Sequence, residues 1–212
     1  MRNLILFISI VLFSSCGNNK PDKTITNKLP IYGERYYDDE LKDTVFHVIP
    51  DFSLTNQNNQ EISNKNIKGK IVVADFFFTS CTTICPKMTS QLKRVAKQIE
   101  KFNDVIILSH TVDPETDNVS TLKNYADING IDTKKWWFLT GDEDFIHEHG
   151  GQGYLLNVMR DSTAQGGFLH SEKFILLDKK SRIRGIYDGT DTKQVDQLIS
   201  DITLLKKEDD GH

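Results

Sequence analysis

Three side chains suited to metal binding or redox chemistry occur in two separate motifs of this chain. Cys81 and Cys85 are four residues apart in the stretch TSCTTICP, and His170 follows 85 positions (170 − 85) after Cys85 in GGFLHS. Thiolates are soft ligands that select Cu(I), and imidazole also suits Cu(II). The residue types therefore predict a copper site with Cys81, Cys85 and His170 as ligands, able to hold either oxidation state of the metal.

The N-terminal segment has the pattern of a bacterial export signal. A short basic start precedes the nearly apolar run Leu4 to Phe13, and Ser14-Ser15-Cys16 follows. A span across a bilayer needs about 20 apolar residues, so this run fits a secretory signal instead. Small residues directly before a cysteine resemble a lipobox, although Phe13 stands where leucine is commonest. We expect residues 1–15 to be a lipoprotein signal peptide and Cys16 to carry lipid; the alternative is an ordinary signal peptide with an incidental cysteine.

This interpretation accounts for the odd number of cysteines. The chain has three, and lipidation of Cys16 leaves only the pair Cys81 and Cys85. Compartments outside the cytoplasm oxidise thiols, so a reactive pair there must be kept reduced or bound to metal. We expect the protein to lie in the cell envelope, anchored by lipid to a membrane, with its domain in the periplasm or otherwise outside the cytoplasm.

Length and charge limit the remaining possibilities. A chain of 212 residues fits one domain with an appendage, and a net charge of −4 argues against nucleic-acid binding. We expect a polar, flexible tether over residues 16–43, a globular domain over 44–207 and a polar tail over 208–212. Within the tether, the tyrosines of residues 31–43 are also candidates for packing on the domain.

Hydrophobic periodicity predicts alternating strands and helices. The run 71–78 is almost wholly apolar, as in a strand buried on both faces. After Pro86, apolar residues recur at steps of four and three through Phe102, as in a helix with one buried face. We expect a hairpin around residues 56–60, further strands at 105–108 and 136–139, helices at 119–128 and 144–150, a hairpin at 174–187 and a last helix at 192–205. Asp117 or Asn118 is expected to cap the helix at 119–128. This order predicts an α/β, thioredoxin-like fold with a central mixed sheet flanked by helices, plus an N-terminal β-hairpin.

The predicted fold places the cysteine pair where a core strand ends and a helix begins. Residues four apart in a helix share a face, and a helix N-terminus stabilises thiolate. The Cys-x-x-x-Cys spacing differs from the Cys-x-x-Cys of redox thioredoxins. The alternative, two buried or incidental cysteines, is disfavoured by this position.

Several separated motifs, in the right order, resemble the Sco/SenC family of copper proteins from about Pro50 to Leu205. They are GKIVV (69–73), FTSCTTICP (78–86), TVDPETD (111–117), FLTGD (138–142), HSEKFILLD (170–178) and RGIYDGT (184–190). The resemblance implies a thioredoxin-like fold and copper held by Cys81, Cys85 and His170. Thr82 departs from the proline that the family often has after its first cysteine.

The resemblance also implies a role and leaves one rival. The implied function is that of a membrane-anchored metallochaperone that helps assemble the binuclear copper centre of cytochrome c oxidase, with a copper-accepting oxidase subunit as partner. The rival is a thiol-disulfide oxidoreductase that reduces client cysteines through Cys81 and Cys85, so enzyme activity stays open. A peroxidase would rest on fold analogy alone.

Other candidate ligands have structural interpretations. His147 and His149 are two residues apart, which separates them on a helix, and we expect both at the surface with weak metal binding as the alternative. His110 follows a buried strand, so packing or a hydrogen bond is expected rather than an approach to the site.

Three further side chains near the predicted site are also explained without chemistry. Met88 lies on the apolar stripe of its helix and is expected in the core. Asp75 and Asp113 are candidates for orienting groups of the site. Their simpler interpretations are a satisfied buried carboxylate and a turn before Pro114.

Overall fold

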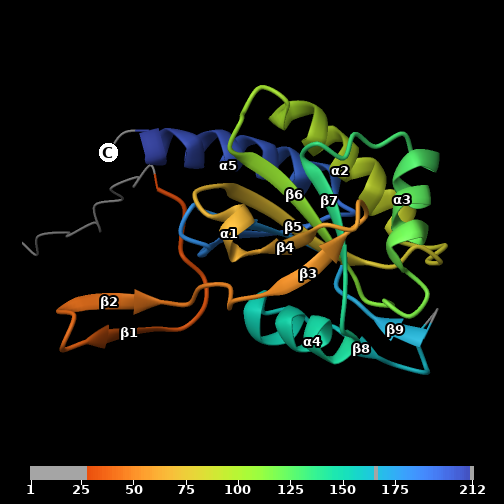
Figure 1. Cartoon of the computed structure of the whole chain (residues 1–212). Coiled ribbons are helices and arrows are strands. Elements are labelled where there is room, and N and C mark those ends of the chain that lie inside the picture. The colour runs from red at the N-terminus through yellow and green to blue at the C-terminus, as the bar shows by residue number, and fades with distance from the viewer. Residues whose placement is uncertain (1–27, 165–166, 211–212) are drawn as a thin grey trace, which may run out of the picture.

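A seven-stranded mixed sheet forms the centre of the molecule (Figure 1). The structure is a computed structural model and describes residues 28–164 and 167–210. The strand order is β11-β10-β5-β6-β7-β3-β4, in which β5, β6 and β7 are parallel to one another. This is the α/β, thioredoxin-like arrangement that the element order predicted.

The described elements, in chain order, alternate as expected. The strands of the central sheet are β3 (Ser53–Asn56), β4 (Glu61–Ser63), β5 (Ile71–Phe77), β6 (Val105–Thr111), β7 (Trp136–Thr140), β10 (Lys173–Leu177) and β11 (Ile183–Asp188). The helices are α1 (Asn64–Ile67), α2 (Cys85–Ile99), α3 (Val119–Ile128), α4 (Glu143–Glu148), the π-helix η1 (His149–Gly153) and α5 (Thr192–Asp210). Two small two-stranded sheets pair β1 (Arg35–Asp38) with β2 (Asp43–Phe46) and β8 (Met159–Arg160) with β9 (Phe168–Leu169).

Each face of the central sheet is covered by its own apolar core. Every residue of β5 and β6 is buried, as expected for strands with both faces covered. One face packs against α2, α3 and α5 through side chains such as Val73, Leu92 and Val195. The other packs against α4 and the segment after it through Ala74, Leu108 and Tyr154. The sheet is therefore a rigid support for the loops at its ends.

Helix boundaries follow local signals where these are strong. Pro86 stands in the first turn of α2, and Met88, Leu92, Val95 and Ile99 form its buried stripe. Asn118 caps α3 by accepting a hydrogen bond from the Thr121 amide. The helices predicted at these two places are confirmed.

The last helix is longer than predicted. It continues to Asp210, because its final turns make contacts with distant parts of the chain. Lys206 pairs with Asp104 at 2.7 Å, and Glu208 accepts hydrogen bonds from Arg184 and from the Leu29 amide. Residues 208–210 of the expected polar tail are thus helical.

The segment ahead of the domain contains a hairpin that periodicity did not predict. β1 and β2 form a separate two-stranded sheet, and Tyr36 and Tyr37 are exposed by 62% and 61%. Tyr32 is joined to the domain through its amide, which donates to the Ile183 carbonyl at 2.9 Å. Of the three tyrosines, Tyr36 and Tyr37 therefore do not pack into the core.

Candidate metal centre

The two motif cysteines lie on the loop that joins β5 to α2, at the carboxyl end of the parallel strands. Cys85 is the first residue of α2 and is 1% exposed, whereas Cys81 is half-buried. The Cys81 amide donates to the Phe78 carbonyl at 3.2 Å, which turns the loop directly after the strand. The buried strand and the helix start therefore fix where both sulfur atoms lie.

A buried aspartate holds the start of this loop. Asp117, fully buried, accepts hydrogen bonds from the amide and hydroxyl of Thr79 and from the Thr111 hydroxyl. Sequence analysis considered Asp117 only as a possible helix cap and missed this role. The contacting residues are 38 positions apart, so only their shared place at the ends of β5 and β6 could have indicated it.

His170 is the residue directly after β9, and its side chain reaches the two cysteines from this segment. Its ring packs edge-on against Phe78, with 5.4 Å between ring centroids. Its Nε2 atom lies 3.6 Å from the Cys85 sulfur. The side chain is nearly buried, at 9% exposure. Residues far apart in sequence are thus brought to one point.

Ion pairs of Arg160, in β8, connect the β8–β9 sheet that precedes His170 to the rest of the domain. Arg160 pairs with Glu143 of α4 and with Glu115, and its guanidinium lies 5.0 Å from the Phe168 ring centroid. These contacts join the hairpin to the loop after β6 and to α4. They restrict where His170 can lie.

The three predicted ligands form one cluster. Ligand atoms of Cys81, Cys85 and His170 all lie within 4.8 Å of one another. Two sulfur atoms and one imidazole nitrogen make a soft donor set. The arrangement is able to hold a metal ion such as copper, with Cys81 on the more exposed side.

The two thiols differ in their readiness to ionise. Burial opposes ionisation of Cys81, but hydrogen bonds from Cys85 and Thr83 outweigh it and lower its pKa below the ordinary value. Burial, together with the neighbouring Cys81, raises the pKa of Cys85. Burial also lowers the pKa of His170, which keeps its imidazole neutral and able to bind metal. Cys81 is therefore the thiol that ionises more readily.

The two candidate orienting aspartates match their simpler interpretations. Asp75 is buried on β5 and accepts a hydrogen bond from Ser109, and burial raises its pKa to about 7. Asp113 accepts a hydrogen bond from the Thr116 amide at 3.3 Å, within the turn that contains Pro114. Neither carboxylate has a hydrogen bond to a predicted ligand among the residues the structure describes.

The remaining candidate ligands have structural roles outside the Cys81–Cys85–His170 cluster. Met88 is in the core at 1% exposure, as predicted. His110 is buried, stacks on Phe76 at 4.8 Å and faces the Asp75 carbonyl through Nδ1 at 3.3 Å, so the packing interpretation is confirmed. His147 is half-buried and hydrogen-bonds the Val112 carbonyl through Nε2 at 2.9 Å.

The prediction for His149 is wrong. It is 4% exposed and lies between the rings of Phe52 and Phe145, at 5.4 and 5.3 Å. The reason is that α4 passes into a π-helix at this residue, so the side-chain directions of a regular helix no longer apply.

Two predictions about the N-terminus concern residues outside the described part. The signal peptide at 1–15 and lipidation of Cys16 fall within residues 1–27. Across residues 28–164 and 167–210, none of the helices has both the length and the apolar character needed to cross a membrane.

Comparison with known proteins places the chain in a family. The SCO1/SenC family model matches residues 42–206. A SCO1/SenC family lipoprotein from Bacillus anthracis is 30% identical, covers 76% of this chain and 95% of its own, and superposes with a TM-score of 0.70. BsSco, a member of the Sco family of cytochrome c oxidase assembly proteins studied for a disulfide switch, is 30% identical, with coverages of 75% and 93% and a TM-score of 0.67.

A third relative was solved with its metal. ScoI of Bradyrhizobium japonicum with copper bound is 25% identical, covers 76% of this chain and 98% of its own, and gives a TM-score of 0.62. The family match spans most of the chain and includes every residue of the Cys81–Cys85–His170 cluster. This chain therefore belongs to the SCO1/SenC family.

Proposed function

We propose that this chain is a membrane-anchored copper chaperone that binds Cu(I) or Cu(II) through Cys81, Cys85 and His170 and delivers it to the copper-accepting subunit of cytochrome c oxidase. The observation that carries the proposal is the convergence of two sulfur atoms and one imidazole within 4.8 Å. Copper-bound ScoI and the oxidase-assembly protein BsSco are similar in sequence and fold, which supports both the metal and the client.

The unequal thiols suit the uptake of copper as cargo. Cys81 is the more exposed ligand and its pKa is lowered, so an incoming ion first meets the thiol that ionises more readily. Cys85 is buried with a raised pKa, so it releases its proton only as the metal arrives. Neutral His170 completes the set without losing a proton.

The same asymmetry suits release to a partner. An exposed ligand is accessible to a client's own cysteines or histidines, whereas Cys85 and His170 stay enclosed by Phe78 and α2. Transfer then proceeds through intermediates in which both proteins hold the ion. A client docked at the carboxyl end of the sheet would meet Cys81 first.

Delivery is tested with the chain loaded with one copper and mixed with the soluble copper domain of the oxidase subunit. We expect the client's optical spectrum to develop with wild type and to fail with His170→Ala. A Cys81→Ser variant that bound and delivered copper as well as wild type would contradict the proposal.

The oxidoreductase remains the second candidate, because a lowered pKa at Cys81 and a buried partner thiol also suit exchange. Cys81 thiolate would attack a client disulfide, and Cys85, after losing its proton to solvent, would then attack the Cys81 sulfur. The client leaves as a dithiol and the chain becomes a disulfide, a balanced two-electron exchange. His170→Ala should leave this activity largely intact, which separates it from copper delivery.

Anchoring through Cys16 is part of the proposal. Its support is the lipobox-like sequence and the Bacillus anthracis relative, which is described as a lipoprotein. Mass spectrometry of the mature protein should find a diacylglyceryl group on Cys16. Recovery of Cys16→Ala in the soluble fraction should accompany this result, and an unmodified Cys16 in wild type would contradict it.

A further inference from the structure

The two ends of the parallel strands carry opposite charge. The segments at the carboxyl ends, 112–118, 141–144 and 188–191, hold eight carboxylates, three of which pair with Arg160 or Lys173 of neighbouring segments. The segments at the amino ends, 64–70, 100–104, 129–135 and 178–182, hold nine Lys or Arg and four Asp or Glu. The metal cluster lies at the acidic end, so the basic end is free for another role.

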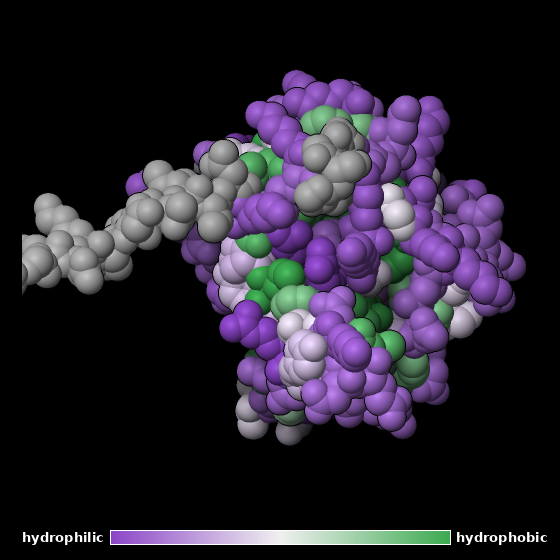
Figure 2. All heavy atoms as spheres, turned by 90° about the vertical axis from the view of Figure 1, so that its left-hand side faces the viewer, coloured by the Kyte–Doolittle hydropathy of each residue, from purple (hydrophilic) through white to green (hydrophobic). Residues whose placement is uncertain are grey.

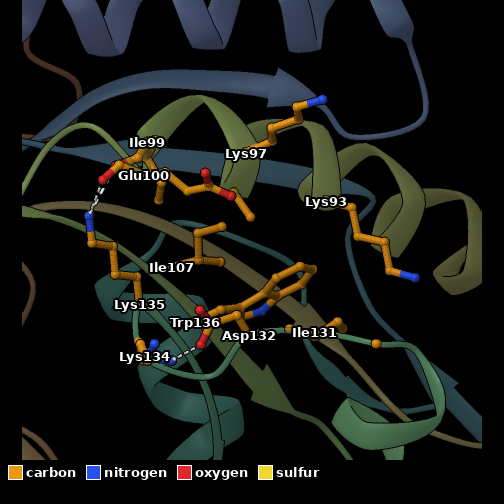
Figure 3. A pocket seen from close by; sticks show the side chains of 12 residues that line it. Lys93, Lys97, Ile99, Glu100, Ile107, Ile131, Asp132, Lys134, Lys135 and Trp136 are labelled. Carbon is orange, nitrogen blue, oxygen red and sulfur yellow. Dashed lines mark hydrogen bonds between the residues drawn. The ribbon is translucent and has the colours of Figure 1, made fainter.

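A groove with a cationic rim lies at the basic end. A cavity of about 590 Å³ separates the last turns of α2 from residues 130–135 (Figure 3). Its floor is apolar: the partly exposed Ala96 and Ile131 line it, above the buried Ile99, Ile107 and Trp136. Within 28–164 and 167–210, no acceptor or carboxylate partners the ammonium groups on its rim, which belong to Lys93, Lys97 and Lys134.

The groove is a built feature of the fold. The Lys135 ammonium donates to the carbonyls of Ile99, Glu100 and Phe102 at 3.3, 2.8 and 2.6 Å. These bonds tie the wall formed by 130–135 to the end of α2. Glu100 and Asp132 also line the groove, which leaves the four lysines in excess over the two carboxylates.

The chain enters the domain at the same end. Arg184 donates to the carbonyls of Leu29 and Pro30 at 2.7 and 3.0 Å, and Glu208 accepts from the Leu29 amide. Lys206, also in α5, pairs with Asp104, which follows the end of α2 that lines the groove. Figure 2 faces this side of the molecule, whose surface is mostly hydrophilic. Thirteen positions (29 − 16) separate Cys16 from Leu29, a reach of at most about 45 Å.

We propose that this groove binds the headgroup of an anionic phospholipid in the membrane that anchors the chain. The inference rests on the proposed lipidation of Cys16. Lysine ammonium groups attract phosphate, and an apolar floor accommodates the glycerol and first methylenes of the lipid. The acidic end is repelled by the same surface, so the domain stands with its metal cluster away from the membrane.

The length of α2 sets the distance between the metal cluster and the groove. Cys85 begins α2, and the groove extends along this helix from Lys93 to its end at Ile99, which is about 12 to 21 Å from Cys85. The β1–β2 hairpin at the basic end carries four carboxylates against Arg35 and Lys42. Attraction is therefore weaker on the side of the hairpin than on the side of the groove.

The test uses the full chain on vesicles of phosphatidylcholine, alone or mixed with phosphatidylglycerol. Hydrogen exchange is measured over 130–135, with Lys93→Gln/Lys97→Gln/Lys134→Gln as the groove variant. The matched control removes the same charge from exposed positions outside the amino-end segments, Lys87→Gln/Lys123→Gln/Lys193→Gln. Each lysine near an anionic membrane changes affinity about fivefold, so the groove variant should bind measurably more weakly.

We expect exchange to slow on mixed vesicles for wild type and the control, but not for the groove variant, and salt to remove the effect. Equal exchange on both vesicles, or a protected groove variant, would overturn the proposal. So would failure of the chain to float with vesicles, or the same protection from soluble glycerol phosphate, which would indicate a site for free anions. Copper titration of the groove variant should match wild type, so failure here is distinct from failure of the chaperone proposal.

Discussion

The carboxyl and amino ends of the central sheet are built in different ways. At the carboxyl end, Cys81 and His170 sit on connecting segments, and their positions depend on a few contacts from Asp117, Phe78 and Arg160. At the amino end, a buried ion-pair network around Arg184 joins β11, α5 and the entering chain. The comparison indicates that one end holds the fold together while the other is arranged for binding, so changes at the two ends should separate stability from copper affinity.

The largest loss of stability is expected from Arg184→Met at the amino end. Arg184 is 5% exposed and pairs with Asp178 and Glu208. Its removal takes this counter-charge from Glu208 and leaves Asp178 with Arg182 alone. Breaking such a pair costs about 3–5 kcal/mol in the free energy of unfolding. Urea denaturation measures the change, and copper stoichiometry of the folded variant should stay at the wild-type value.

The matched control is Arg94→Met, which removes an exposed pair with Asp196. Its cost should be within about 1 kcal/mol. Equal losses in the two variants would mean that the buried network does not stabilise the amino end as described.

Asp75→Asn, in the middle of the sheet, should stabilise the protein in a pH-dependent way. Burial raises the folded-state pKa of Asp75 from 3.8 to about 7, so ionisation is opposed in the folded state and free in the unfolded one. The penalty begins as pH rises above 3.8 and is complete above about 7. The variant should therefore gain roughly 4 kcal/mol above pH 7 and almost nothing near pH 4.

Free energies of unfolding, measured for both proteins between pH 4 and pH 8, test whether ionisation of Asp75 causes the difference. Asp39→Asn changes an exposed carboxylate and should stay within about 0.5 kcal/mol of wild type. A gain from Asp75→Asn that is the same at pH 4 and pH 8 would contradict the assigned cause.

Asp117→Asn tests the support of the metal-binding loop. The amide keeps one acceptor oxygen for three donors, so Thr79 or Thr111 loses a partner and the loop before Cys81 loosens. Loss of such supporting hydrogen bonds typically weakens metal affinity about 10–100-fold. Competition with a Cu(I) chelator measures it.

The matched variant is Asp191→Asn, which changes a carboxylate at the start of α5 that contacts Lys193 instead of the metal-binding loop. Its copper affinity should equal that of wild type. An Asp117→Asn protein with unchanged affinity would show that the loop is held by other means.

The smallest effect is expected from Tyr36→Ser on the β1–β2 hairpin. The side chain is 62% exposed, so little apolar contact is lost. The free energy of unfolding should change by less than about 0.5 kcal/mol, and copper affinity should not change. A larger destabilisation, measured by urea unfolding, would mean that the hairpin packs against the domain in solution.

The sequence predicted those parts of the fold that carry local signals. The stripe of α2, the Asn118 cap of α3 and the apolar run of β5 were each visible in a short window. The extra turns of α5 were not visible in the sequence, because they are stabilised by contacts of Lys206 and Glu208 with distant segments. The inward turn of His149 depends on a π-helix that hydrophobic periodicity does not reveal.

The residues of the candidate site also differ in whether the sequence could predict them. Cys81, Cys85 and His170 could be named from residue type and motif, and the structure brings them together. The role of Asp117 could not be predicted, because it depends on the pairing of β5 with β6, which places the ends of these two strands side by side. The difference between the two thiols likewise depends on burial that no spacing shows.

The measurement that tests the central claim most directly is an anaerobic copper titration of the reduced chain beside its His170→Ala variant, followed by X-ray absorption and optical spectroscopy. We predict one tightly bound copper per chain with two sulfur ligands and one imidazole, and weaker or absent binding in the variant. No tight site, or a site that is unchanged by loss of His170, would contradict the account and favour a dithiol oxidoreductase.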